Sequence, residues 1–142
     1  MSHKEMTAAI MVLGAIVISA WVAWSTTSGG LPATGAEAAR NMLWAIGYVI
    51  GFNIVAVILG TILVSIVRRE ELRDEATDER DRLVNSRAMR NGYFVLSIGV
   101  LAVLFAQAFG LDAVLMPYAL FGISMLAGAA FGISQLVYYR LD

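Results

Sequence analysis

The chain has 142 residues, of which 59% are hydrophobic and only 15% are charged, and its mean hydropathy is +0.74. This composition is too apolar for an ordinary soluble domain of this length. The net charge of −1 lacks the basic excess needed to neutralise phosphates, so direct nucleic-acid binding is not expected. The absence of cysteine excludes disulfides, thiolate metal sites and dithiol redox relays.

Charge is concentrated in one segment, Arg68 to Arg90, which is flanked by long uncharged stretches. A charged side chain at the centre of a bilayer costs about 2.5–3.5 kcal/mol even on the mildest scale. The pattern therefore predicts an all-α integral membrane protein that forms a single four-helix domain over residues 1–142. We expect transmembrane helices at about residues 6–24, 41–67, 92–109 and 116–139.

The first span matches the roughly 30 Å hydrocarbon core at about 1.5 Å per residue. Because Ser2-His3-Lys4 precedes this apolar run, a secretory signal peptide is the alternative interpretation. The run is longer than a signal core, however, and Trp21 and Trp24 stand where cleavage requires small residues. We therefore expect the segment to be retained as a helix.

The length of the second span and the residues between the third and fourth spans indicate where these helices begin and end. The second span is longer than a bilayer requires, so we expect it to tilt or to begin in the interface. Gly110 and Asp112 are typical of a helix stop followed by a turn, and Pro117 suits the first turn of the last helix.

Residues 68–91 are rich in good helix formers, and Thr77-Asp78-Glu79 is typical of a helix N-terminus. We expect the second and third helices to continue out of the membrane and to turn near Ala76. The two would then form one antiparallel, charged helical hairpin in the cytoplasm. Within it, Asp78 and Arg82 have the i,i+4 spacing of an ion pair, and Glu71 should come near Arg82 across the turn.

This hairpin supplies the candidate partner-binding residues. A solvated, self-paired stalk and a docking surface for anionic lipid or an acidic protein are equally compatible with its charge pattern. The candidates are Glu71, Asp78, Glu79, Arg80, Asp81, Arg82, Arg87 and Arg90.

Orientation follows from the basic residues, because all of the ten except Arg40 would lie on one side of the membrane. The positive-inside rule then places both termini and the hairpin in the cytoplasm. The sequence thus predicts a multi-pass protein of a bacterial or archaeal cytoplasmic (inner) membrane.

No Asp, Glu, Lys, Arg or His lies within the four expected spans, which argues against proton relays and charged-substrate sites. The single histidine, His3, is expected to be solvated in the N-terminal tail, so we expect no metal site and no cofactor. The intramembrane polar candidates are Asn53, Gln107 and Gln135. Hydrogen bonding between helices is favoured for these amides over a permeation path.

Small residues at intervals of four mark candidate helix-packing positions, because they let two backbones approach closely. Packing within the bundle and a homodimer seam are equally compatible with this pattern. The positions are Gly47 and Gly51 in the second span and Ser124, Gly128 and Gly132 in the fourth.

The motif Asp78-Glu79-Arg80-Asp81 is followed by Leu83, by Arg87 to Arg90 and by Gly92-Tyr93. This run resembles the D-E-R-D signature of an uncharacterised family of small four-helix prokaryotic membrane proteins, and the resemblance covers about residues 69–101. Members are often encoded beside small helix-turn-helix regulators, so the resemblance implies a cytoplasmic regulatory partner. It implies no catalytic residue.

A second run, Asn85 to Asn91, resembles the Arg-Ala and Asn pattern of four-helix membrane enzymes that use glutathione, in which arginines bind the tripeptide. In those enzymes the pattern lies at the second helix and includes a glutamate. Here it opens the third helix, and no acidic residue follows within the span.

The sequence therefore favours a non-enzymatic membrane protein that presents a charged cytoplasmic hairpin to a partner in signalling or regulation. The alternative is an oligomeric channel or transporter for a neutral small solute, with Asn53 and Gln107 lining the path. A glutathione-using membrane enzyme is the third hypothesis.

Overall fold

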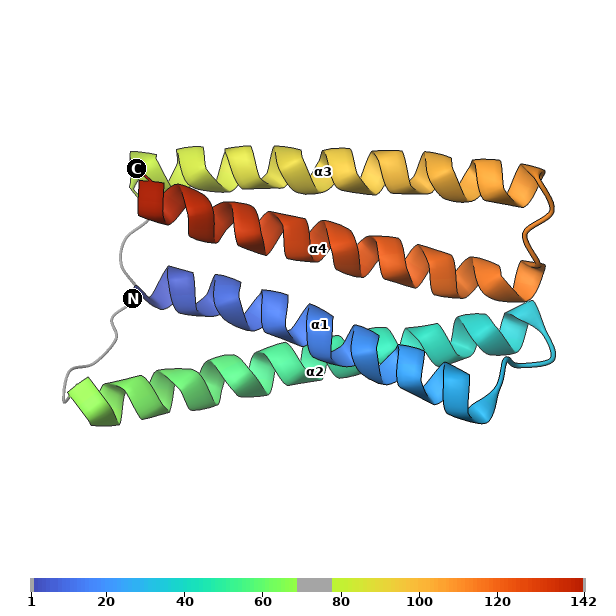
Figure 1. Cartoon of the computed structure of the whole chain (residues 1–142). Helices are drawn as coiled ribbons and strands as arrows, with labels where there is room; N and C mark the ends of the chain where they lie inside the picture. The colour runs from blue at the N-terminus through green and yellow to red at the C-terminus, as the bar shows by residue number, and fades with distance from the viewer. Residues whose placement is uncertain (1, 69–77, 142) are drawn as a thin grey trace.

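A computed structural model describes residues 2–68 and 78–141 and consists of helices (Figure 1). All four long helices are long and apolar enough to cross a membrane, which confirms the predicted all-α, four-helix architecture. The elements are α1 (His3–Gly29), α2 (Gly35–Arg68), α3 (Glu79–Ala108), the short 3₁₀ helix η1 (Ala113–Leu115) and α4 (Met116–Leu141).

Each helix is longer than the expected apolar span. The described part of the stalk and the third span form one continuous helix of 30 residues, α3, which is about 45 Å long. The predicted stop after the third span is confirmed, because Gly110 adopts a φ of +101°, a conformation that favours glycine. Pro117 lies in the first turn of α4, as expected.

Helix α4 is central to the arrangement. It packs against α3 on one side and α1 on the other, and α1 also packs against α2 (Figure 1). Helices α2 and α3 lie on opposite sides of the α1–α4 pair. Within the described residues, the prediction that the second and third helices pair as an antiparallel hairpin is therefore wrong. Residues 69–77, which include Glu71 and the expected turn at Ala76, lie outside the described residues.

Glycines explain why α3 pairs with α4. A Cβ added to Gly92 would lie 3.2 Å from the carbonyl oxygen of Ala127 and 3.3 Å from the Cβ of Phe131. A Cβ added to Gly99 would lie 2.5 Å from Ile123 Cγ2. Two helices approach this closely only where one of them carries no side chain.

A glycine also lies at the close contact between α1 and α4. A Cβ added to Gly132 would lie 2.7 Å from Val12 Cγ2 and 3.2 Å from the carbonyl oxygen of Ala8. Gly132 is thus the one candidate packing position that the structure places between helices of the same chain. An added Cβ at Gly47, Gly51 or Gly128 would meet nothing within 4 Å. Ser124 is exposed, and its hydroxyl donates to Leu120 O at 2.8 Å within α4.

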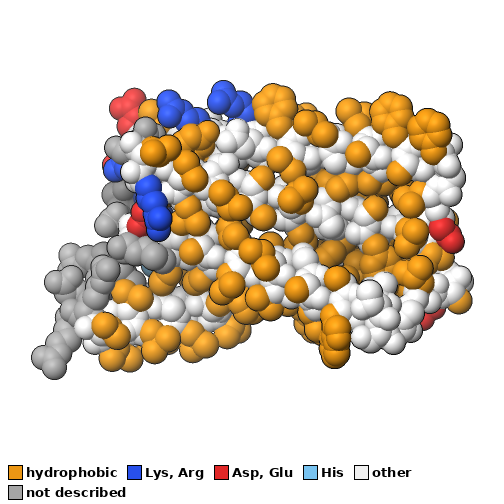
Figure 2. Space-filling view, viewed as in Figure 1, with side chains coloured by type: hydrophobic (Ala, Val, Ile, Leu, Met, Phe, Trp, Pro, Cys, Tyr) orange, Lys and Arg blue, Asp and Glu red, His pale blue; other side chains and the backbone are white. Residues whose placement is uncertain are grey.

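The surface is extensively apolar, and Figure 2 shows hydrophobic side chains over most of the visible face. Trp24 is 68% exposed and Phe109 is 89% exposed. The buried cluster is small, comprising Val22, Met42, Ala45 and Phe121. A water-soluble monomer rarely exposes so large an apolar surface, so the molecule is consistent with a multi-pass membrane protein.

The glycine contacts generate a matched test with Gly132→Ala and Gly128→Ala. Both changes gain about 1 kcal/mol of helix propensity, but only the first forces a methyl group against α1. We expect Gly132→Ala to be less stable than Gly128→Ala by about 1–3 kcal/mol, measured as the free energy of unfolding in mixed micelles. Equal stabilities would contradict the α1–α4 contact.

Candidate functional site

Both termini and the start of α3 lie at one end of the molecule, which we call the charged end (Figure 1). Polar side chains from α1, α3 and α4 meet at this end. Asp81 on α3 is at the centre. Its carboxylate accepts a hydrogen bond and forms a salt bridge with the Lys4 ammonium group of α1, and Oδ1 accepts from the Tyr139 hydroxyl of α4 at 3.2 Å. The Lys4 and Asp81 side chains are only 23% and 16% exposed. This cluster therefore connects α1, α3 and α4.

Local sequence fixes the two helix ends that carry these groups. Asp78 caps α3, since its Oδ1 accepts from Asp81 N at 2.8 Å while Asp81 Oδ2 accepts from Asp78 N at 3.2 Å. Ser2 and Glu5 form the equivalent reciprocal cap on α1. The helix start predicted at Thr77-Asp78-Glu79 is thus confirmed, with Asp78 as the cap. The expected Asp78–Arg82 ion pair is not formed, because the Asp78 carboxylate serves as the cap.

The C-terminus of α4 is held at the same place. The guanidinium of Arg80 donates from Nη2 to the carbonyl oxygen of Tyr139 at 3.0 Å. This carbonyl belongs to the last turn of α4, where intrahelical donors are absent. Arg80, a predicted partner-binding residue, is therefore used within the chain, although it remains exposed.

A second row of contacts joins α3 to α4. Gln135 Nε2 donates to Asn85 Oδ1 at 3.1 Å, so the predicted interhelical role of Gln135 is confirmed. Asn91 Nδ2 lies 3.0 Å from Ser134 Oγ and 3.2 Å from Tyr138 Oη. The guanidinium carbon of Arg87 lies 5.9 Å from the centroid of the Tyr138 ring, a cation–π geometry.

The structure divides the candidate partner-binding residues into two groups. Asp78, Arg80 and Asp81 bind within the chain, as described above. Glu79, Arg82, Arg87 and Arg90 are exposed, and Arg87 also contacts Tyr138. Figure 2 shows Lys and Arg side chains gathered near the start of α3. Glu71 lies outside the described residues.

The remaining intramembrane amides are not brought together. Asn53 Nδ2 donates to Val49 O of its own helix at 2.9 Å, while its buried Oδ1 has no partner. This oxygen lies 3.1 Å from the position of a Cβ added to Gly14, so it faces α1. Gln107 is exposed near the end of α3. Because α2 and α3 do not pack together, the two amides line no common path within the described residues of one chain.

His3 differs from its expected place as a solvated tail residue. It is the first residue of α1, it is half-buried, and its Nε2 lies 3.4 Å from the Thr61 hydroxyl oxygen of α2. No local pattern indicates this contact, because the two residues are 58 positions apart in the sequence.

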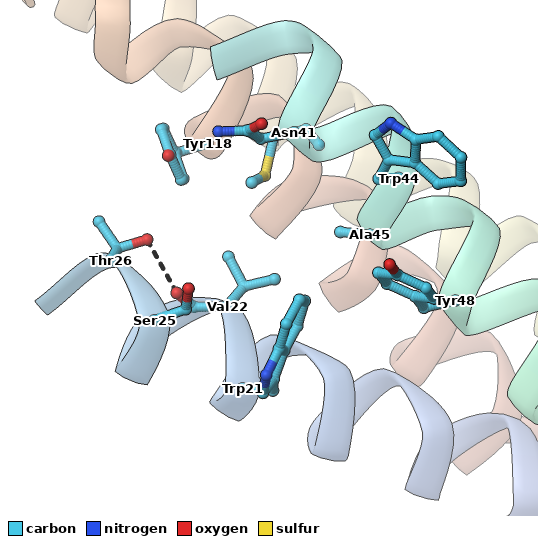
Figure 3. A pocket seen from close by; sticks show the side chains of 10 residues that line it. Trp21, Val22, Ser25, Thr26, Asn41, Trp44, Ala45, Tyr48 and Tyr118 are labelled. Carbon is cyan, nitrogen blue, oxygen red and sulfur yellow. Dashed lines mark hydrogen bonds between the residues drawn. The ribbon is translucent and has the colours of Figure 1, made fainter. Parts of the chain in front are cut away.

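A hollow of about 340 Å³ lies at the opposite end, between α1, α2 and α4 (Figure 3). Trp21 and Tyr48 line the hollow, and their rings contact each other in an edge-to-face arrangement with the ring centroids 5.6 Å apart. Its polar lining consists of hydroxyl and amide groups from Ser25, Thr26, Asn41 and the two tyrosines, and the Thr26 hydroxyl already donates to Val22 O at 2.8 Å. This lining carries no charged group, and its aromatic residues are typical of a membrane interface.

Within residues 2–68 and 78–141, no group of three His, Asp or Glu side chains could hold a metal ion. Comparison with protein-family models, curated proteins and solved structures finds no match for the chain.

The Asp81 cluster predicts energetic coupling between α1 and α3. Lys4→Met and Asp81→Asn should show a coupling free energy of about 1 kcal/mol in a double-mutant cycle, because each change removes the same partly buried ion pair. Unfolding in mixed micelles measures this energy.

The matched control is Lys4→Met combined with Glu79→Gln, because Glu79 lies in the same helical turn and is exposed. The control pair should be additive within about 0.5 kcal/mol. Additivity in both cycles would show that the salt bridge contributes nothing to the fold.

Proposed function

We propose that this chain is a non-enzymatic, multi-pass protein of a prokaryotic cytoplasmic membrane that presents α3 to a cytoplasmic regulatory protein. Both termini and the start of α3 lie at one end of the molecule, and this end carries most of the basic residues. By the positive-inside rule, the charged end faces the cytoplasm.

The observation that carries the proposal is the bare outward face of α3. This helix packs on α4 through a narrow buried stripe that includes Val84, Ala88 and Gly92. On the opposite face, Arg82, Ser86 and Arg90 follow one another at four-residue steps, and all three are exposed. We call these three residues the outward face.

The charge of this region indicates the chemistry of the partner. Residues 82–91 contain three arginines and no acidic residue. A partner surface rich in Asp and Glu would therefore be complementary and would associate rapidly. The docking surface is thus assigned to α3 alone, in place of the hairpin expected from the sequence.

The run Asp78-Glu79-Arg80-Asp81 resembles the D-E-R-D motif. This resemblance supports a regulatory partner, since members of that family are often encoded beside small regulators. The channel hypothesis gains no support from the geometry of a single chain, because Asn53 faces α1 and Gln107 lies exposed on α3. A homodimer through the open small residues Gly47, Gly51, Ser124 and Gly128 is compatible with docking.

The orientation can be tested by cysteine labelling, because the native chain contains no cysteine. A cysteine replacing Ser28 should react with an impermeant maleimide in intact cells, whereas one replacing Glu79 should react only after permeabilisation. Both positions are exposed and lie at opposite ends of the molecule. The reverse pattern would show that the charged end faces outward.

The docking surface can be tested by a photoreactive residue placed at Ser86 in native membranes. We expect crosslinking to one discrete cytoplasmic protein, reduced about tenfold by Arg90→Glu and retained in Arg90→Lys, because docking depends on positive charge at the outward face. Quantitative mass spectrometry of the crosslinked band measures the yield.

Leu104 provides the matched control, since it lies five helical turns further along the same face of α3 and is 55% exposed. The photoreactive residue at this position should crosslink no cytoplasmic protein. A Ser86 crosslink that survives Arg90→Glu, or one equal to the Leu104 crosslink, would refute the docking surface.

A further inference from the structure

A groove opens between α1 and α3 at the charged end, with α4 as its floor. It arises because, in the described residues, α1 and α3 both pack on α4 and do not pack along each other. The Lys4–Asp81 salt bridge joins α1 to α3 at the end of the groove. The cavity has a volume of about 450 Å³, and its lining includes Lys4, Arg82 and Asn85. We call it the α1–α3 groove.

The polar part of the groove offers hydrogen-bond donors. The Lys4 ammonium group has three N–H donors, and one of them serves Asp81. Arg82 is exposed, and its guanidinium meets no polar partner among residues 2–68 and 78–141. Asn85 accepts from Gln135 through Oδ1, which leaves its amide N–H groups without an acceptor in the same part of the chain.

The lining includes one carboxylate, Asp81, and its negative charge is offset by the salt bridge with Lys4. Asp81 already accepts from Lys4, from the Tyr139 hydroxyl and from the backbone N–H of Asp78. With His3 neutral, Lys4, Arg82 and Asp81 leave the lining with a net charge of +1. The groove therefore matches a ligand with one negative charge and several acceptor oxygens, such as a phosphodiester.

The other end of the groove is apolar. Met11 and Phe131 line it, about two helical turns from Lys4 and Tyr139 respectively. A free phosphate would gain nothing from these side chains, whereas an acyl chain would pack on them. Basic pockets between helices on the cytoplasmic side of a membrane are typical headgroup sites.

We propose that the α1–α3 groove binds one anionic glycerophospholipid. Its phosphate lies among Lys4, Arg82 and Asn85, and its acyl chain runs past Met11 and Phe131 into the bilayer. This lipid takes Arg82, one of the three residues of the outward face, and leaves Ser86 and Arg90 exposed. The argument for the lipid rests on the groove lining and does not use the proposed protein partner.

The test is native mass spectrometry of the purified full-length protein in neutral detergent with defined lipids. Phosphatidylglycerol should bind about tenfold more tightly than phosphatidylcholine. Arg82→Gln should weaken phosphatidylglycerol binding about fivefold, the factor expected for one arginine near a headgroup. The matched control Arg90→Gln removes the same charge two turns away and should change the affinity by less than about twofold.

Two competitors distinguish the sources of the anion. Inorganic phosphate and glycerophosphoglycerol, which has no acyl chains, should not displace the bound lipid. Displacement by either would assign the groove to a soluble anion and overturn the proposal. Equal binding of the two lipids, or equal losses in Arg82→Gln and Arg90→Gln, would also overturn it. Circular dichroism of both variants checks that the helices are intact.

Discussion

The close approach of α3 to α4 is the contact on which the rest of the structure depends. Gly92 and Gly99 let the two helices approach closely: a Cβ at Gly92 would be in tight contact with Ala127 and Phe131, and one at Gly99 would collide with Ile123. Within the described residues α3 packs on α4 and not on α2, and the face of α3 opposite α4 is exposed. The same contact brings Asp81 to the ends of α1 and α4, where Lys4 and Tyr139 meet it.

Hydrogen bonds and the Lys4–Asp81 ion pair then hold the helices together at the charged end, in addition to the glycine contacts. In a lipid environment the hydrophobic effect does not drive helices together, so small residues and hydrogen bonds must determine the neighbours. Here the glycine contacts run along the helices, while the ion pair and most of the amide contacts lie at the charged end. That division leaves a groove between α1 and α3 and an exposed outward face on α3, the two surfaces to which we assign recognition.

The sequence predicted the features that depend on local chemistry. The four helices, a helix start at Thr77-Asp78-Glu79, the stop at Gly110 and the interhelical amide Gln135 were all expected, because each follows from hydropathy, capping preference or the cost of an unpaired amide. The packing partners of each helix were not expected from the sequence. Glycines occur at regular spacing in several helices, and spacing alone does not tell Gly132, where an added Cβ would meet α1, from Gly128, where an added Cβ would meet nothing within 4 Å. The Lys4–Asp81 pair spans 77 positions, so no local pattern could reveal it.

Disulfide trapping in the bilayer tests the α3–α4 contact most directly. Cysteines replacing Gly92 and Phe131 should oxidise to an intrachain disulfide, because their Cβ atoms would lie 3.3 Å apart, near the usual 3.5–4.5 Å. Cysteines replacing Gly92 and Thr61 would lie opposite each other in a hairpin of α2 and α3, and they should not react. A disulfide between positions 92 and 61, with none between positions 92 and 131, would contradict the account.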